Sequence, residues 1–204
     1  MIYGGQGADL IIGGDGNDGI RAGSGNDTVF AGAGNDDVDG GNGDDYLDLG
    51  ADNDSADGGN GNDIVLGRNG HDTITGSQGR DLLIGGVGAD KLTGNSDEDV
   101  LIAGDTSYDG NQAALVAIMA EWSSNKTYAA RVSNLLNGTG LTGGNKLNGN
   151  DGATQTVFAD ADIDTLSGSQ GTDLFWANLV ADNGGAIDVL MDKASNETAN
   201  DSDL

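Results

Sequence analysis

Gly13-Gly14-Asp15-Gly16-Asn17-Asp18-Gly19-Ile20-Arg21 is one of eleven consecutive nonapeptides that run without a gap from Gly4 to Ile102. In each unit the first four positions are mostly glycine, the sixth is always aspartate and the eighth is always apolar. The sixth-position residues are Asp9, Asp18, Asp27, Asp36, Asp45, Asp54, Asp63, Asp72, Asp81, Asp90 and Asp99. The eighth-position residues are Ile11, Ile20, Val29, Val38, Leu47, Ala56, Val65, Ile74, Leu83, Leu92 and Leu101.

The nine-residue period predicts a solenoid, because each unit can bury its apolar residue only by stacking on its neighbours. The glycines before each aspartate predict a tight turn, since a residue without a side chain adopts positive φ at little steric cost. The three residues after the aspartate are predicted to form a short strand, with position eight inward and positions seven and nine outward. The outward residues, such as Thr28, Phe30 and Thr73, follow no clear pattern.

These units resemble the repeats of the repeats-in-toxin family, whose repeat reads Gly-Gly-x-Gly-x-Asp-x-apolar-x. Residues 4 to 102 match that repeat throughout. The resemblance implies a right-handed parallel β-roll in which two repeats make one turn, so that each repeat stacks on its next-but-one neighbour. It also implies that calcium lies between stacked turns. We therefore expect residues 1 to 104 to form a calcium-binding β-solenoid in an all-β dominated chain.

The resemblance implies that the calcium ligands are the sixth-position carboxylates together with backbone carbonyls of the glycine-rich turns. One rank of turns would hold Asp9, Asp27, Asp45, Asp63, Asp81 and Asp99, and the opposite rank Asp18, Asp36, Asp54, Asp72 and Asp90. Adjacent pairs number five in the first rank and four in the second, which implies about nine calcium ions in this array. The candidate carbonyl donors are Gly4, Gly13, Gly40 and Gly58 at first positions and Gly7, Gly16, Gly25, Gly34, Gly43 and Gly61 at fourth positions.

Electrostatics independently favours a bound cation. Stacked turns lie roughly 4.8 Å apart, so two carboxylates in one rank repel by about 3 to 4 kcal/mol at an effective dielectric near 20. Summed over the nine pairs of the two ranks, that repulsion comes to roughly 30 kcal/mol and exceeds a typical net stability of about 5 to 15 kcal/mol, so we expect the metal-free roll not to hold. Several oxygen ligands, partly from backbone, suit calcium better than magnesium. Because the chain has no cysteine and only one histidine, His71, zinc and copper sites are poorly provided for.

Some repeats depart from the pattern. The fourth-position glycine is replaced by Asp52, Asp97 and Asp162, and Leu49 replaces a first-position glycine. Aspartate tolerates left-handed geometry better than most residues, so these turns can survive and can gain a ligand. A less acidic stretch, where we expect the lowest occupancy, contains Arg68, His71, Ser77 and Arg80. We interpret His71 as a solvent-facing turn residue.

Composition limits the classes of partner. Acidic residues outnumber basic ones 34 to 8, and the formal net charge of -26 argues against nucleic acid or anionic membranes. No apolar stretch approaches the roughly 20 residues that span a bilayer. Met1-Ile2-Tyr3 fits positions seven to nine of a preceding repeat and no signal peptide is visible. We therefore expect the chain to be the tail of a longer protein or a truncated form, with upstream domains as its covalent partners.

From Gly104 onward the composition changes, and we expect residues 105 to 204 to form a small α+β capping module. Apolar residues at helical spacing predict one helix from about 111 to 123 and a second from about 127 to 137. The second ends at Asn137-Gly138. We expect these helices to cover the open end of the roll. The predicted faces are Leu115, Ile118, Met119 and Trp122, and Tyr128, Val132, Leu135 and Leu136.

A degenerate form of the repeat returns later. Residues 168 to 176 form another nonapeptide with Asp173 at its sixth position, and Asp164 lies nine residues earlier. We therefore expect the roll to resume over about 159 to 176, with both aspartates as further metal ligands. Helices followed by returning repeats resemble the C-terminal modules that close such arrays in large secreted bacterial proteins.

Other motifs in the chain are weaker. Asp160, Asp162 and Asp164 begin like an EF-hand loop, but Thr165 stands where glycine is needed and Gly171 where the bidentate glutamate belongs. The spacing Gly14-x-Gly16-x-x-Gly19 matches a dinucleotide fingerprint without a surrounding βαβ unit. No nucleophile or metalloprotease motif is present, so we expect no enzymatic activity in this chain.

Three functional classes remain in view. The first, implied by the resemblance, is a calcium-binding structural module that folds outside the cell and supports type I secretion and stability of a larger exported protein. The second is a surface-adhesion or ice-binding solenoid, which needs a regular outward face; Thr28, Thr73, Thr75 and Thr93 form no ladder in the sequence. The third is an accessory module of an extracellular enzyme whose catalytic domain lies upstream. All three place the chain outside the cell or on its surface.

Overall fold

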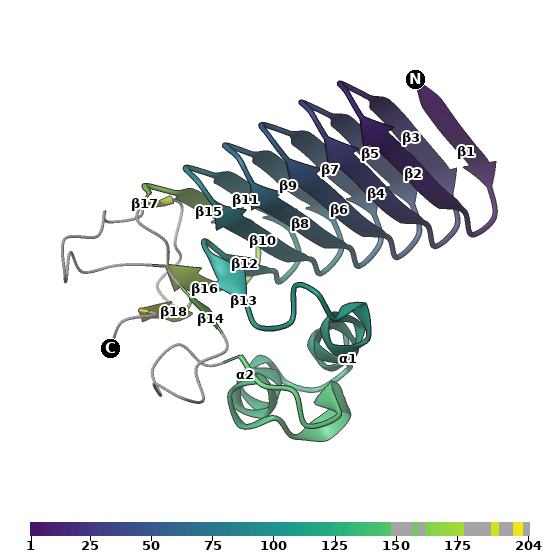
Figure 1. Cartoon of the computed structure of the whole chain (residues 1–204). Coiled ribbons are helices and arrows are strands. Elements are labelled where there is room, and N and C mark those ends of the chain that lie inside the picture. Colours follow the sequence, from purple (N-terminus) through teal and green to yellow (C-terminus); the bar gives the residue numbers. More distant parts are fainter. Residues whose placement is uncertain (148–156, 159–161, 178–188, 192–197, 202–204) are drawn as a thin grey trace.

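The computed structural model describes residues 1–147, 157–158, 162–177, 189–191 and 198–201. Successive strands alternate between two parallel sheets of eight strands each, so the chain winds as a β-solenoid (Figure 1). This confirms the predicted fold class. The odd sheet contains β1 Ile2–Gln6, β3 Gly19–Ser24, β5 Asp37–Asn42, β7 Ser55–Asn60, β9 Thr73–Gln78, β11 Lys91–Ser96, β15 Thr165–Ser169 and β17 Val189–Met191. The even sheet contains β2 Leu10–Asp15, β4 Thr28–Ala33, β6 Tyr46–Ala51, β8 Ile64–Asn69, β10 Leu82–Val87, β12 Val100–Ile102, β16 Leu174–Ala177 and β18 Thr198–Asp201.

Strand register confirms that each repeat stacks on its next-but-one neighbour. Ile11 of β2 pairs with Val29 of β4, and Val29 pairs in turn with Leu47 of β6. Each pairing skips one repeat, so two nonapeptides make one turn. The eighth-position residues consequently form two inward columns, one from each sheet, and they are buried along the whole array.

The strands are longer than the short segment predicted after each aspartate. They run from the seventh position of one repeat to the third position of the next, as in β2 and β4. The glycine at position two adopts a positive φ and still pairs with the same position one turn later, as Gly14 does with Gly32. The turn is therefore confined to positions four to six. First-position side chains also point inward, and Ala22, Ala31 and Leu49 are buried in the core.

After β12 the chain leaves the roll as an insertion. It contains β13 Asp105–Thr106, α1 Gln112–Trp122, α2 Tyr128–Asn137, the 3-10 helix η1 Gly140–Thr142 and β14 Val157–Phe158. The roll then resumes, because Lys91 of β11 pairs with Thr73 of β9 on one side and with Thr165 of β15, beyond the insertion, on the other. Residues 159–161 of the predicted late repeats lie outside the described residues. No helix in the described part of the chain is long and apolar enough to span a membrane.

The helices cover a face of the roll and not its open end, which corrects the expectation from sequence. Figure 1 shows α1 and α2 alongside the even sheet, and the end of the roll is formed by β15 to β18. The outward residues of the even sheet do follow a pattern, which appears only when every second repeat is compared. They pack with the helices into a second core that contains Tyr46, Ile64, Leu66, Leu82, Ile84, Val100, Ile102, Leu115, Ile118, Met119, Trp122, Leu135, Leu147, Leu174 and Trp176.

The outer face of the odd sheet is polar. Here the structure corrects a second expectation, since Thr75 pairs with Thr93 and Thr93 pairs with Ser167, which makes a short row of hydroxyls. The row ends at Asp57, the partner of Thr75 on the other side, and Lys91 interrupts the parallel row at position seven. The regular extended face that an ice-binding solenoid needs is therefore not formed by these strands.

Candidate metal centres

The sixth-position aspartates form two continuous ladders, one along each edge of the roll. In every adjacent pair the carboxylate Oδ1 accepts a hydrogen bond from the backbone N–H of the aspartate one turn earlier, at 2.6–2.8 Å. Asp45, for example, receives the N–H of Asp27 at 2.7 Å. Asp164 and Asp173 extend the ladders by accepting from Asp90 and Asp99. All thirteen predicted aspartates thus lie in two columns with eleven adjacent pairs.

The second carboxylate oxygen is buried without a hydrogen-bond partner in most members of the ladders. Orphaned buried oxygens are uncommon in native proteins and costly, so each one calls for a physical explanation. The Oδ2 atoms of the ladders lie close to the first-position residues. At Gly40, for example, an added Cβ would lie 2.6 Å from the Oδ2 of Asp45 and 2.5 Å from the carbonyl oxygen of Gly58. The orphaned Oδ2 atoms belong to Asp9, Asp27, Asp36, Asp45, Asp54, Asp63, Asp72, Asp81 and Asp99.

Backbone carbonyls crowd the same corners. Gly61, at a fourth position, has φ +138, and a Cβ on it would overlap the carbonyl oxygen of Gly43 one turn earlier. A Cβ on Gly59, at a second position, would overlap the carbonyl oxygen of Gly41 in the same way. A side chain cannot occupy either place. The predicted fourth-position glycines all lie in these turns with positive φ, namely Gly7, Gly16, Gly25, Gly34, Gly43 and Gly61.

The predicted first-position glycines are placed differently. Gly4, Gly13, Gly40 and Gly58 lie inside strands, beside Oδ2 atoms of the ladders. Sequence reasoning missed the second-position glycines, whose carbonyls face the next turn as the one of Gly41 does. Most repeats begin with two glycines, and this regularity in the sequence could have indicated the second-position carbonyls as candidate ligands.

Burial raises the pKa values of the central aspartates. The pKa of Asp63 rises to about 8, that of Asp81 to about 7 and that of Asp99 to about 9. In the opposite rank the pKa of Asp54 rises to about 7. Loss of hydration is the largest cause at each of these groups, and the charges of neighbouring aspartates add to it. The expectation from sequence rested on repulsion between neighbouring carboxylates. At these groups, loss of hydration opposes ionisation more strongly than that repulsion does.

The raised pKa values predict that acid favours the metal-free fold. A carboxyl whose pKa is higher in the folded than in the unfolded state contributes stability that is fully present below its unfolded pKa of about 3.9 and is lost as pH rises through the folded value. We therefore expect calcium-stripped protein to gain β-structure as pH falls from about 9 to about 5. Far-ultraviolet circular dichroism against pH measures this.

A matched variant serves as the control for this pH dependence. Asp63→Asn with Asp81→Asn makes two ladder groups permanently neutral and keeps an oxygen that accepts the N–H of the preceding turn. The variant should retain more β-structure than the parent chain at pH 8. A β signal that stays constant between pH 9 and 5 in the parent chain would contradict the assignment of these groups.

No group of three or more His, Cys, Asp or Glu side chains suited to a metal is found in the described residues. A cation at these turns has at most two ladder carboxylates within reach and must complete its shell with backbone oxygens. Such an all-oxygen donor set fits Ca²⁺ and gives transition metals none of the nitrogen or sulfur ligands they favour. Asp164 belongs to the ladder, which leaves the competing EF-hand interpretation without one of its ligands.

The fifth-position residues form a second, exposed ladder. The Oδ1 of Asn53 accepts the backbone N–H of His71, and the Nδ1 of His71 accepts that of Ala89, both at 2.8 Å. His71 is exposed as predicted, and in addition it takes the place of an asparagine in this ladder. The backbone N–H of Arg80 still donates to the Oδ1 of Asn62 at 3.2 Å, but its guanidinium turns toward the helical insertion and does not continue the ladder.

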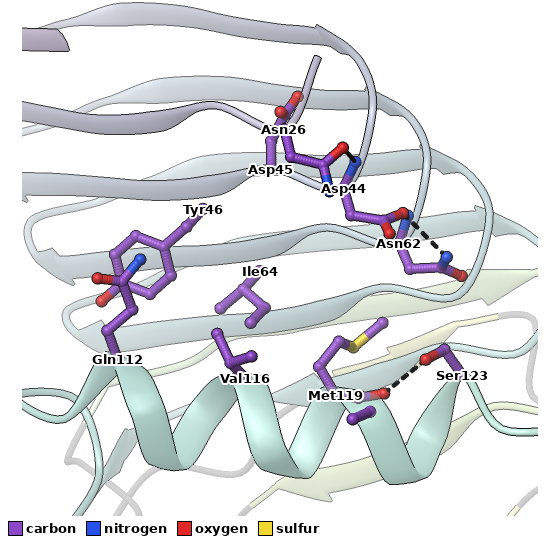
Figure 2. Close-up of a pocket in the computed structure, with 11 residues that line it drawn as sticks. Asn26, Asp44, Asp45, Tyr46, Asn62, Ile64, Gln112, Val116, Met119 and Ser123 are labelled. Carbon is purple, nitrogen blue, oxygen red and sulfur yellow. Dashed lines mark hydrogen bonds between the residues drawn. The ribbon is translucent and has the colours of Figure 1, made fainter. Parts of the chain in front are cut away.

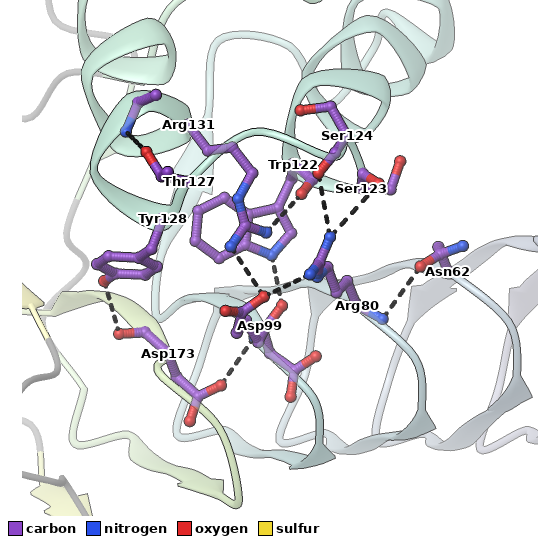
Figure 3. A network of polar contacts seen from close by, with 12 residues as sticks. Asn62, Arg80, Asp99, Trp122, Ser123, Ser124, Thr127, Tyr128, Arg131 and Asp173 are labelled. Atoms are coloured by element: carbon purple, nitrogen blue, oxygen red, sulfur yellow. Dashed lines mark hydrogen bonds and ion pairs between the residues drawn. The ribbon is translucent and has the colours of Figure 1, made fainter.

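A polar network fastens the insertion to the last turns of the ladders (Figure 3). Glu98 accepts ion pairs from Arg80 at 2.7 Å and from the buried Arg131 at 2.8 Å, and its backbone carbonyl accepts the indole N–H of Trp122 at 2.6 Å. The guanidinium of Arg131 also lies 4.6 Å from the centre of the Trp122 ring. The Tyr128 hydroxyl donates to the backbone carbonyl of Asp173. Docking of the helices and order of the turns around Asp99 and Asp173 are therefore linked.

Comparison with known proteins agrees with this geometry. A search of curated proteins finds no match to the chain. The family model described as RTX calcium-binding nonapeptide repeat (4 copies) matches residues 1–29, 12–47, 21–56, 39–74, 75–106 and 154–183. The matched segments cover more than half of the 204 residues and include both the main array and the resumed repeats. The chain therefore belongs to the RTX calcium-binding nonapeptide repeat family.

Proposed function

We propose that this chain is a calcium-dependent structural module, in which Ca²⁺ bound between stacked turns allows the ladders to remain ionised inside the roll. The observation that carries the proposal is the row of buried Oδ2 atoms without partners, which face glycine corners crowded by carbonyl oxygens. A calcium ion supplies the positive charge and the coordination that these oxygens otherwise lack. The RTX repeat is a structural calcium-binding unit, and we assign the chain no catalytic role.

The proposed ligands are the carboxylates of adjacent ladder aspartates and the carbonyls of glycines at the first, second and fourth positions. The main array offers nine adjacent pairs, and the pairs Asp90–Asp164 and Asp99–Asp173 add two. We therefore propose up to eleven ions. Arg68, Ser77 and Asn95 hold positive φ at second positions without being glycine, so the strands there keep the backbone conformation of the other repeats.

We further propose that the module folds outside the cell. RTX repeats are typical of secreted proteins, and extracellular calcium modules bind with dissociation constants of about 10⁻⁴ to 10⁻³ M. At the low calcium concentration of a cytosol the ladders would stay unfilled and the chain unfolded, which suits export by a type I system. Folding after export would then stabilise the upstream domains of a longer parent protein.

Calorimetric titration of single substitutions tests the ligand assignment. Asp63 has ladder neighbours on both sides, Asp45 and Asp81, whereas Asp9 has one, Asp27. Substitution by asparagine removes the charge and keeps an oxygen for the N–H of the preceding turn. We expect Asp63→Asn to weaken or abolish two calcium sites and Asp9→Asn to affect one. Equal loss of bound calcium in both variants, or no loss in either, would refute sharing of aspartates between neighbouring sites.

A further inference from the structure

The outer face of the even sheet stays apolar beyond the part that the helices cover. On β2, Leu10 is 67% exposed and Ile12 is 68% exposed, and on β4 Phe30 is 37% exposed. Phe30 also packs on the ring of Tyr46, with centroids 6.1 Å apart, and Tyr46 belongs to the second core under the helices. The exposed residues are therefore the direct continuation of an interface that already binds helices.

The uncovered strip has the width of one helix. It consists of β2 and β4, and two neighbouring strands span about 10 Å, which is also the spacing of about 8 to 10 Å at which helices pack side by side. A groove of about 370 Å³ opens where the next helix would lie against α1. Figure 2 shows Tyr46 and Ile64 of the sheet facing Val116 and Met119 of the helix across this groove. Val116 is 49% exposed.

The negative charge around the strip favours a helix that carries basic side chains. Residues 1 to 67 contain seven aspartates outside the sixth positions and a single basic residue, Arg21, which is paired with Asp37 on the odd sheet. Neither β2, β4 nor β6 contains a lysine or arginine. Asp44 and Asn26 are exposed at the rim of the groove, and Asn62 beside them is half-buried. The surface is thus apolar in its centre and negative at its edge, even with every ladder carboxylate neutralised by calcium.

From this geometry we propose that the face formed by β2 and β4 is a docking site for one amphipathic helix of a partner protein, with an apolar face and basic flanks. The helix lies beside α1, its apolar side chains contact Leu10, Ile12 and Phe30, and its basic side chains approach Asp44. The same charge disfavours a second copy of this chain as the occupant, because both surfaces would be negative. The proposal needs only the folded roll and holds whichever oxygens bind calcium.

Designed peptides long enough for about five helical turns test the proposal on the calcium-saturated full chain. One peptide carries leucine and lysine at helical spacing, a second has glutamate in place of lysine, and a third has the leucine and lysine order scrambled. Titration calorimetry at about 0.15 M salt limits long-range attraction to a Debye length of about 8 Å. We expect the first peptide to bind at least about tenfold more tightly than the scrambled one, since burying one apolar side chain is worth that factor. It should also bind more tightly than the glutamate peptide, whose carboxylates would lie beside Asp44 and repel it.

Surface variants locate the binding. Ile12→Ser combined with Phe30→Ser should weaken the leucine and lysine peptide by about tenfold or more. Tyr3→Ser is the matched control, because Tyr3 is 71% exposed on the odd sheet. Circular dichroism in the same calcium buffer separates a lost surface from an unfolded chain. Equal binding by all three peptides, equal weakening by Tyr3→Ser, or a calcium-loaded dimer abolished by Ile12→Ser would each overturn the proposal.

Discussion

Removal of calcium by a chelator is expected to abolish most of the far-ultraviolet β signal of this chain, and magnesium is not expected to restore it. At neutral pH, keeping the ladder ionised leaves buried carboxylate oxygens without a hydrogen-bond partner at positions such as Asp63, Asp81 and Asp99. Desolvation of that kind already raises the pKa of Asp99 to about 9. Ionising several of these central groups at once therefore opposes a net stability that is typically only about 5 to 15 kcal/mol.

Magnesium is the control that separates specific coordination from screening of charge. Mg²⁺ carries the same charge, but it requires a near-ideal octahedron and dehydrates reluctantly, whereas calcium accepts irregular sets of carboxylate and carbonyl oxygens. Circular dichroism is recorded after dialysis against chelator and then after addition of either ion. Full β-structure in excess chelator at pH 7.5, or equal recovery in the two ions, would contradict calcium-dependent folding.

Truncation after residue 104 is expected to produce a chain that aggregates or needs more calcium to fold. The truncation uncovers the outer face of the even sheet and opens the ends of β11 and β12. Burial of one aliphatic side chain contributes about 1.5 to 3 kcal/mol, and several lose their cover at once. The uncovered residues on three adjacent strands are Ile64, Leu66, Leu82, Ile84, Val100 and Ile102.

A surface-repaired truncation distinguishes loss of face cover from loss of the end strands. Threonine is β-branched and suits a strand, and it removes much of the exposed apolar surface. The repaired chain carries Ile64→Thr, Leu66→Thr, Leu82→Thr and Ile84→Thr. If face cover is the main role of the insertion, the repaired chain should be monomeric and fold at a lower calcium concentration than the simple truncation. A simple truncation that stays monomeric, with the calcium midpoint of the full chain, would refute the stabilising role of residues 105 to 204.

The two cores differ in how far the sequence predicts them. The inward column at position eight depends only on the nine-residue period, so Ile20, Val38 and Leu92 could be placed without a structure. To predict which outward residues are buried, one must compare every second repeat and know which segment covers each sheet. Ile64 and Leu66 are buried, whereas Thr73 and Thr75, one repeat later, lie on the polar sheet. The difference between the two sheets arises because the helical insertion packs on the outer face of the even sheet and buries its apolar residues.

The recurrence of aspartate at one corner of every repeat follows from the sequence by itself, because a repeated turn places the same residue at the same corner each time. The two ranks and the stacking of next-but-one repeats were implied by the resemblance to the RTX repeats, and the strand register confirms that stacking. Tertiary structure alone decides that the helices cover a face, that Glu98 joins Arg80 and Arg131, and that burial raises the pKa of Asp99 to about 9. Glu98 and Arg131, for example, are 33 residues apart, and Arg131 lies in a helix outside the repeats, so the nine-residue period cannot predict their contact. The physical reason is that periodicity fixes neighbours along the roll, whereas burial across its faces depends on where a non-repeating segment packs.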